Sequence, residues 1–123
     1  MKSLGRIILL TVLASFLNEA YAATSKIGIL VFDGFLTSDV TAPIEVFGAA
    51  TKKSWFSSYE VVLVSVSKGK TVLSEEGLKI VADKTIYDDL KLDVLLIPSA
   101  YEMDGYLNNE DLIQFIEKQG RSA

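Results

Sequence analysis

The sequence has 123 residues, enough for one small domain. It contains 12 basic and 16 acidic residues, for a formal net charge of −4, and it has neither Cys nor His. An acidic chain without a basic cluster is a poor candidate for binding a nucleic-acid backbone. The two missing residue types exclude disulfides, thiol nucleophiles, imidazole bases and the commonest ligand of transition metals.

Residues 1–22 have the pattern of a secretory signal peptide. Lys2 and Arg6 precede an apolar run from Ile7 to Leu17, and Ala20-Tyr21-Ala22 supplies an A-x-A cleavage pattern. The eleven residues of the run are too few for a membrane span, which needs about 20. A buried core helix is the third alternative, and the basic flank and the cleavage pattern argue against it.

We therefore expect a secreted or periplasmic domain over residues 23–123, with no stable membrane anchor after cleavage. A lipid anchor is excluded because the chain has no Cys. Removal of Lys2, Arg6 and Glu19 from 12 basic and 16 acidic residues leaves 10 and 15, a net charge of −5. Without disulfides, the stability of this domain must come from its apolar core.

Residues 26–32 (KIGILVF) form an apolar run rich in β-branched residues, which is typical of a strand covered on both faces of a parallel sheet. Asp33-Gly34 then marks a turn. Thr37, Ser38 and Asp39 are N-cap candidates for a helix that we expect to end near residue 51. Pro43 lies close to the start of this helix, where its missing N–H is tolerated.

The remaining elements complete an alternating order. Residues 59–67 predict a second strand, and residues 71–73 and 78–82 predict a small hairpin around a turn at 74–77. A connection over 86–92 leads to a strand of the buried type over 93–98. An amphipathic helix follows, with Asn109 as its N-cap and Gly120 as its C′ residue. Strands that alternate with helices predict an α/β fold with a parallel sheet and right-handed crossovers.

Two groups of residues have simple structural interpretations. Trp55, Phe56 and Tyr59 are expected to pack in the core or along the edge of the sheet. The acids Asp88, Asp89 and Asp104 suggest a divalent cation, but they lack EF-hand spacing, so we expect them to be solvated loop acids.

The ordered set of segments resembles the amino-terminal half of the ThiJ/PfpI family, in the class I glutamine amidotransferase-like superfamily. The resemblance rests on F-D-G at Phe32 to Gly34, Asp39 five residues later, P-x-E-V-F at Pro43 to Phe47, and the strand LDVLLIPSA. It is closest to the branch of isocyanide hydratases and of sensor domains fused to AraC-type regulators. It implies a flavodoxin-like parallel sheet sandwich, incomplete here because the last strands and helices of the family's fold are missing.

The resemblance also implies a thiol site. In the family a Cys on a strand-to-helix elbow is the nucleophile, and an acid from the first strand–helix corner touches it. Asp39 occupies the position of that acid. Ser99 and Ala100 occupy the place of a Gly-Gly pair whose N–H groups help to form an oxyanion site. The elbow would follow residue 123, so the family's nucleophile is absent from this sequence.

Three functions stay open on these observations. The first is an exported partial domain without catalytic activity of its own, which leaves binding of a small molecule and homodimer formation open. The second is the first half of a Cys-dependent hydratase, amidase or glyoxalase-like enzyme. The third is the ligand-sensing domain of a transcription regulator. We expect no cofactor, metal or nucleic-acid partner.

Simpler roles compete for each candidate residue. In these simpler roles Asp39 is an acid at the start of a helix, where the helix dipole favours it, and Glu45 is an acid on the face of that helix. Ser99 has no evident base nearby in the sequence to activate it as a nucleophile. The open edge of a truncated parallel sheet predicts low stability or aggregation.

Overall fold

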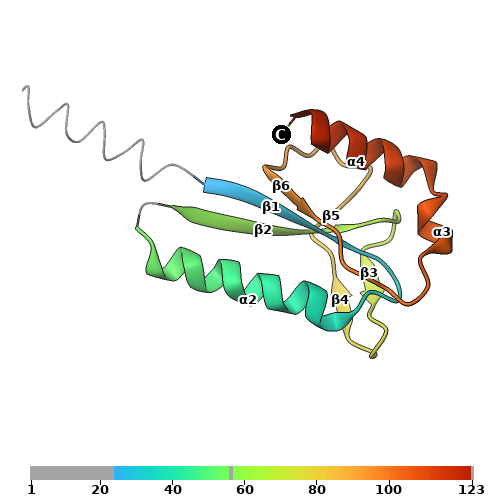
Figure 1. Ribbon diagram of the computed structural model, residues 1–123, viewed down its shortest axis with the longest axis horizontal. Coiled ribbons are helices and arrows are strands. Elements are labelled where there is room, and N and C mark those ends of the chain that lie inside the picture. Colours follow the sequence, from blue (N-terminus) through green and yellow to red (C-terminus); the bar gives the residue numbers. More distant parts are fainter. Residues whose placement is uncertain (1–23, 56, 123) are drawn as a thin grey trace, which may run out of the picture.

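The computed structural model describes residues 24–55 and 57–122 (Figure 1). The predicted signal peptide at 1–22 and the aromatic residue Phe56 lie outside the described residues. In chain order the elements are β1 (Thr24–Val31), α2 (Thr37–Lys53), β2 (Ser58–Ser65), β3 (Thr71–Leu73), β4 (Lys79–Val81), β5 (Lys84–Thr85), β6 (Val94–Leu96), α3 (Asp104–Leu107) and α4 (Glu110–Ser122). None of the helices within the described ranges is long and apolar enough to cross a membrane.

The fold is a parallel α/β sheet, as the sequence predicts. Four strands lie in the order β5-β2-β1-β6, and each pairing is parallel. Helix α2 connects β1 to β2, whereas α4 follows β6, and Figure 1 shows the two helices on opposite sides of the sheet. The strands β3 and β4 form a separate antiparallel hairpin, which confirms the hairpin expected around residues 74–77.

The core is centred on β1, one of the two inner strands of the sheet. Ile29, Leu30 and Val31 are fully buried, which confirms the expectation of a strand covered on both faces. Burial of each such side chain contributes about 1.5–3 kcal/mol. Gly28 has a specific role in this strand, because a side chain there would collide with the buried Leu92. The loop before β6 can therefore pack closely against β1.

Helix α2 begins and ends differently from the prediction. It starts at Thr37 and runs to Lys53, so Thr37, Ser38 and Asp39 lie inside its first turn, and none of them is its N-cap. Its N-cap position is occupied by Leu36, which provides no side-chain hydrogen bond. The carboxylate of Glu76 instead accepts a 3.4 Å hydrogen bond from the Thr37 N–H. A partner 39 residues away cannot be recognised from local capping patterns.

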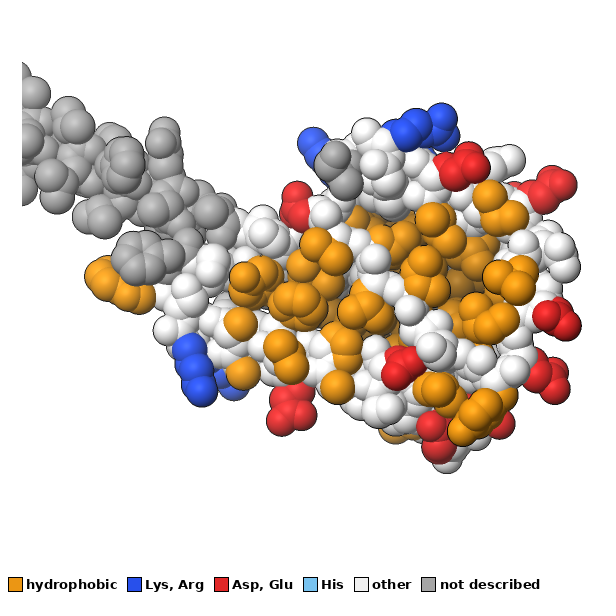
Figure 2. Space-filling view, viewed as in Figure 1, with side chains coloured by type: hydrophobic (Ala, Val, Ile, Leu, Met, Phe, Trp, Pro, Cys, Tyr) orange, Lys and Arg blue, Asp and Glu red, His pale blue; other side chains and the backbone are white. Residues whose placement is uncertain are grey.

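The strand expected over 93–98 is shorter and less buried than predicted. Among the described residues β6 pairs only with β1. Val94 and Ile97 are therefore about half exposed, at 47% and 49%. Figure 2 shows apolar side chains gathered over the middle of this face of the molecule. An open edge and an apolar face agree with a sheet that is only part of a larger one.

The last helix confirms one expectation and corrects another. Asn109 caps α4 as predicted, because its Oδ1 accepts a 3.1 Å hydrogen bond from the Leu112 N–H. Gly120 is not a C′ residue, since α4 continues to Ser122. The buried Gln119 bridges this helix to the loop before β6. Its amide oxygen accepts from the Leu92 N–H at 3.2 Å, and its amide nitrogen donates to the Leu90 carbonyl at 2.9 Å.

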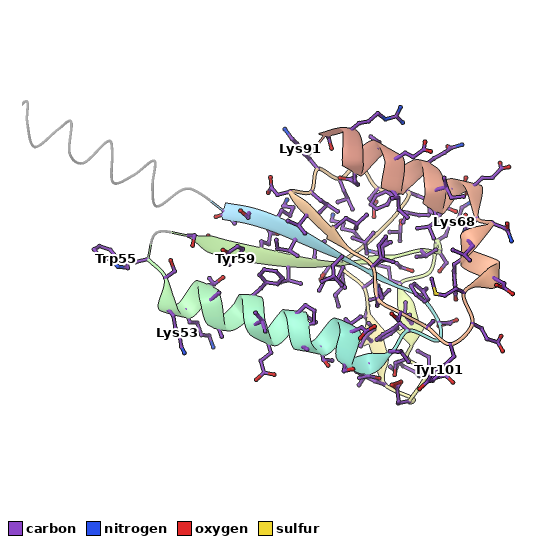
Figure 3. The ribbon with its side chains drawn as sticks, viewed as in Figure 1. Lys53, Trp55, Tyr59, Lys68, Lys91 and Tyr101 are labelled. Carbon is purple, nitrogen blue, oxygen red and sulfur yellow. The ribbon has the colours of Figure 1, made fainter. Side chains whose placement is uncertain are left out.

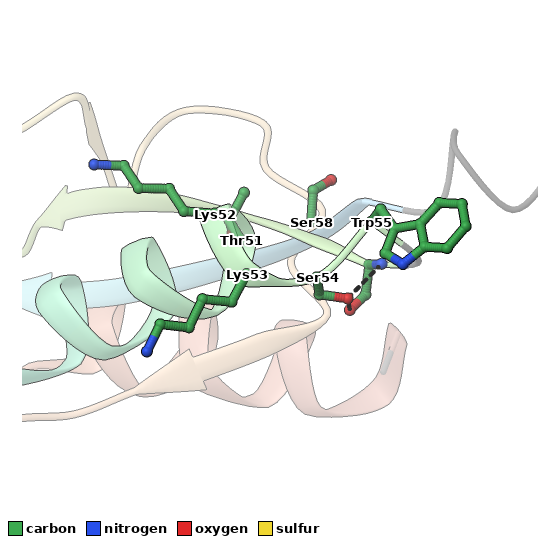
Figure 4. Close-up of a pocket in the computed structure, with 7 residues that line it drawn as sticks. Thr51, Lys52, Lys53, Ser54, Trp55 and Ser58 are labelled. Atoms are coloured by element: carbon green, nitrogen blue, oxygen red, sulfur yellow. Dashed lines mark hydrogen bonds between the residues drawn. The ribbon is translucent and has the colours of Figure 1, made fainter.

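The aromatic residues before β2 divide between two environments. Tyr59 packs against Phe47 with ring centroids 5.2 Å apart, as expected. Trp55 is 69% exposed, so the packing role predicted for it is wrong. It lies in the turn beyond the end of α2 (Figure 3 and Figure 4).

Candidate active-site corner

The carboxyl ends of β1 and β6 lie side by side at the point where the order of the strands in the sheet reverses direction. The chain leaves β1 through α2 toward β2 on one side, and β6 lies on the other side of β1. In open α/β sheets, ligands bind at such a switch point, in the crevice outside the carboxyl ends of the strands. The residues predicted from the family resemblance lie at this position.

Asp39, Ser99 and Ala100 are brought together at the switch point. The Asp39 Oδ2 accepts a 2.8 Å hydrogen bond from the Ser99 N–H, across 60 residues of sequence. The Ser99 carbonyl in turn accepts from the Leu36 N–H at 2.9 Å, and Phe35 forms an isolated antiparallel bridge with Ala100. These bonds join the start of α2 to the segment after β6.

This arrangement gives Asp39 a fixed orientation. It also commits the Ser99 N–H, because an amide that donates to a carboxylate is not at the same time fully available to a ligand oxyanion. The oxyanion role of Ser99 and Ala100 stays a prediction. For an oxyanion to bind here, Asp39 must release the Ser99 N–H, or another backbone N–H must donate the hydrogen bond in its place.

The β3–β4 hairpin supports this corner from the side. The Thr37 hydroxyl lies 2.7 Å from the Oγ of the buried Ser74 and 3.2 Å from Glu76 Oε2. On the strand side of the corner, Asp33 Oδ1 accepts from the Leu73 N–H at 3.0 Å. The turn before α2 is therefore held by residues of the hairpin as well as by the segment after β6.

A cleft of about 980 Å³ opens beside the corner. It is lined by Asp33, Gly34, Glu75, Tyr101, Glu102, Met103, Asp104, Gly105 and Tyr106. Four of these side chains are carboxylic acids, which makes the cleft acidic. Asp39 is not among the lining residues, so the cleft and the predicted acid are neighbouring features of the same end of the molecule.

Tyr106 forms the inner wall of this cleft. Its hydroxyl donates a 2.7 Å hydrogen bond to the Asp33 carbonyl, and its ring lies 4.4 Å from that of Phe32. Burial raises the pKa of Tyr106, and the negative charge of Asp33 raises it further. The phenol is therefore a stable neutral donor in the physiological range.

The acids that suggested a divalent cation do not form a metal site together. Asp88 Oδ2 accepts from the Thr85 N–H at 2.8 Å, and Asp89 lies 3.5 Å from the ammonium of Lys118. Asp104 begins α3, and Glu45 is exposed on α2. Within residues 24–55 and 57–122 no group of three or more acids is placed to hold a metal ion.

Comparison with known proteins identifies the fold family. Residues 25–123 match the DJ-1/PfpI family, which includes the ThiJ proteins. The chain belongs to the DJ-1/PfpI family. A curated relative, "Putative cysteine protease YraA" of Bacillus subtilis, is 32% identical over 83 residues, which cover 66% of this chain and 45% of the relative.

Solved structures show the same DJ-1/PfpI architecture. A DJ-1 superfamily protein from Salmonella typhimurium superposes with a TM-score of 0.68 at 16% identity, over 79% of this chain and 50% of the other. An AraC family transcriptional regulator from Pseudomonas putida gives a TM-score of 0.65 at 19% identity, over 79% and 59%. At these identities the likeness shows the fold alone. The chain spans about half the length of the relatives that it matches.

The sequence indicated Asp39 and Ser99, but not the residues that hold the surrounding turn and line the cleft. Thr37 is recognisable in the sequence only as a capping candidate, and Glu76 only as part of a hairpin turn. Tyr106 lay in a segment without a recognisable pattern. The Asp33-Gly34 pair was the one available signal, since Gly34 has a φ of +91°, a conformation that favours glycine.

Proposed function

We propose that this chain contributes the acid-bearing half of a DJ-1/PfpI thiol site and performs no thiol chemistry by itself. The observation that supports the proposal is the position of Asp39, whose carboxylate is oriented by the Ser99 N–H at the β1/β6 switch point. The sequence contains no Cys. The proposed role of Asp39 is to accept or share the proton of a thiol supplied by another segment, which would adjust the nucleophilicity of that thiol.

The open edge of the sheet supports the proposal that a further segment completes the domain. Strand β6 pairs on one side only among the described residues, and its Val94 side chain is about half exposed. Relatives are about twice as long as this chain. A further parallel strand beside β6 would bring its carboxyl end to the same switch point as Asp39, where a nucleophile is needed.

Two alternatives concern the complete protein. One is a Cys-dependent hydratase, amidase or glyoxalase-like enzyme, and the cysteine protease name of the Bacillus subtilis relative favours thiol chemistry in general. The other is a ligand-sensing domain, which the fold shared with the AraC family regulator from Pseudomonas putida permits. Continuation of the gene into a helix-turn-helix segment would favour the second.

The genomic DNA after codon 123 provides the first test. A continuation that encodes a strand, a Cys elbow and a helix would support the proposal, in frame or after a frameshift. A continuation of unrelated sequence would remove the proposed source of the thiol. For this chain alone, we expect no turnover of a dicarbonyl, an isocyanide or an amide, and turnover abolished by Asp39→Asn would overturn the proposed inactivity.

The role of Asp39 is tested in the continuous protein by the pH dependence of thiol alkylation with iodoacetamide. Asp39→Asn should shift the pH profile by about one unit, equivalent to a tenfold change in thiolate population at a fixed pH. Glu45→Gln is the matched control, since Glu45 is an exposed acid on the same helix. Identical profiles for Asp39→Asn and the wild type would contradict the assigned role.

A further inference from the structure

The sequence contains very few sulfur atoms. It has no Cys and two methionines, Met1 and Met103, so residues 23–123 contain a single thioether. Oxidation of a thioether to a sulfoxide turns a flexible apolar side chain into a polar one, and the reaction is reversible by reductases. Within residues 23–123, sulfur chemistry of this kind is therefore confined to Met103.

Met103 lies at the boundary between the core and the solvent. Its side chain is partly buried and packs against the hydrophobic core. It also lines the cleft of about 980 Å³ beside the candidate active-site corner. A small oxidant in the cleft therefore meets a residue whose apolar packing helps to hold the domain together.

Met103 also begins the segment that forms the inner wall of the cleft. It is the N-cap of the short helix α3, and its carbonyl accepts from the N–H groups of Tyr106 and Leu107 at 2.9 and 3.0 Å. Tyr106 is held at its other end, where its hydroxyl donates to the Asp33 carbonyl and its ring packs on Phe32. We call residues 103–106 the cleft latch, because these contacts join the segment to the end of β1.

The packing of the cleft latch depends on its first and last residues. Met103 and Tyr106 both pack against the core. Asp104 and Gly105, which lie between them, are exposed, and a Cβ added at Gly105 would meet no atom within 4 Å. Loss of the apolar contact at Met103 would therefore leave Tyr106 to hold the latch in place.

The charge of the cleft favours one kind of oxidant. Its nine lining residues include four carboxylic acids and no basic residue. Such a lining repels anionic oxidants, whereas it leaves the approach of an uncharged molecule such as hydrogen peroxide unaffected. Among oxidants of similar strength, a neutral peroxide is therefore the one that reaches Met103 most easily.

We propose that Met103 is a site of reversible oxidation by hydrogen peroxide, and that its oxidation releases the cleft latch. The sulfur attacks one peroxide oxygen, an S–O bond forms and the O–O bond breaks. The departing hydroxide takes the proton of the transferred hydroxyl and leaves as water. The sulfur loses two electrons, and the peroxide gains them. The proposal does not depend on the proposed thiol chemistry, because it uses no thiol.

The release follows from the polarity of the product. A sulfoxide oxygen packed against apolar side chains costs free energy unless it finds a hydrogen-bond donor. Water in the cleft supplies such donors, so the oxidised side chain should turn away from the core. Tyr106 then loses a neighbour that holds its segment in place, and its contacts with Phe32 and Asp33 should open more often.

Mass spectrometry and amide hydrogen exchange of the full chain test both parts of the proposal. After treatment with hydrogen peroxide, the tryptic peptide from Leu92 to Lys118 should gain one oxygen atom at Met103. Exchange at the amides of Tyr106 and Leu107 should become about tenfold faster or more. Treatment with both types of methionine sulfoxide reductase and dithiothreitol should restore slow exchange.

Two substitutions separate oxidation of Met103 from damage elsewhere. Met103→Leu keeps an apolar side chain of similar volume that cannot be oxidised, so its exchange should stay slow with and without peroxide. Met103→Gln places a polar group of similar length at the same position and should show fast exchange without peroxide. Periodate, an anionic oxidant, should oxidise Met103 more slowly relative to a short methionine peptide than peroxide does, and added salt should reduce this difference.

Four results would overturn the proposal. The first is an unoxidised Met103 at a peroxide concentration that fully oxidises the short peptide. The second is slow exchange at Tyr106 and Leu107 in the oxidised chain. The third is an equal acceleration by peroxide in Met103→Leu, which would place the effect at another residue. The fourth is an equal relative rate for periodate and peroxide, which would contradict the selection of a neutral oxidant.

Discussion

The two ends of the molecule differ in how they are built. At the carboxyl ends of the strands, four segments are joined by hydrogen bonds between residues distant in sequence, among them the bond of Asp39 to Ser99 and the contacts of Thr37 with the hairpin. At the other end, the turn that follows Lys52 and Lys53 and carries Trp55 is held by local hydrogen bonds. We infer that the first end fixes its geometry through contacts between distant segments, whereas the second end relies on bonds within a few residues.

This comparison predicts the largest loss of stability for a change at the carboxyl-end corner. Phe35 is fully buried between the two segments that meet at Asp39. Phe35→Ala removes this packing and leaves a cavity, so it should lower the free energy of unfolding by about 3–5 kcal/mol. Urea denaturation followed by circular dichroism measures the loss. Phe35→Leu, which keeps most of the volume, should cost less than about 1.5 kcal/mol.

A smaller loss is expected when the hairpin is released from the corner. Thr37→Val keeps the shape of the side chain but removes the hydroxyl that contacts Ser74 and Glu76. The expected cost is about 1–2 kcal/mol, at the lower end if water replaces the contact with the exposed Glu76. Thr41→Val is the matched control, because the Thr41 hydroxyl donates to the Thr37 carbonyl one turn earlier, within the same helix. Equal losses for both variants would contradict a specific role for the hairpin.

The turn after β5 should contribute a stability that depends on pH. The Thr85 N–H hydrogen bond holds the pKa of Asp88 below its ordinary value of 3.8. A lowered pKa in the folded state means that the stabilisation is present above pH 3.8 and is lost as the pH falls through the lowered pKa. Asp88→Asn should therefore be less stable than the wild type at neutral pH, and the difference should shrink in strong acid. A difference that is constant with pH would contradict this assignment.

The smallest effect on stability is predicted in the turn after α2. Trp55→Ser removes a mostly exposed ring and should change the free energy of unfolding by no more than about 0.5 kcal/mol. A loss comparable to that of Phe35→Ala would show that the ring is part of the core. That result would contradict the difference in construction that we infer between the two ends.

Some of this architecture follows from local patterns and some does not. The apolar runs of β1 and β2, the hairpin and the Asn109 cap were predictable because their signals lie within a few residues. The start of α2 was not, since its first N–H is satisfied by Glu76 from the hairpin. The exposure of Trp55 and of β6 depends on what else packs nearby, and no pattern within those segments encodes it.

The predicted site shows the same division. The family resemblance indicated Asp39, Ser99 and Ala100, and the structure places them side by side. The hydrogen bond that joins Asp39 to the Ser99 amide spans 60 residues and has no signature in either segment. Whether these residues take part in chemistry is a question for the experiments on Asp39.

The central position of β1 has a consequence for how the chain folds. The first strand pairs with the last, and Lys26 meets Asp93 across 67 residues. Contacts between such distant residues cost much chain entropy before they provide any energy, so they slow folding. During synthesis, β1 must wait for β6 to emerge before both of its edges are paired. Through this interval the most buried strand of the described sheet has an unpaired edge, which favours aggregation until β6 pairs with it.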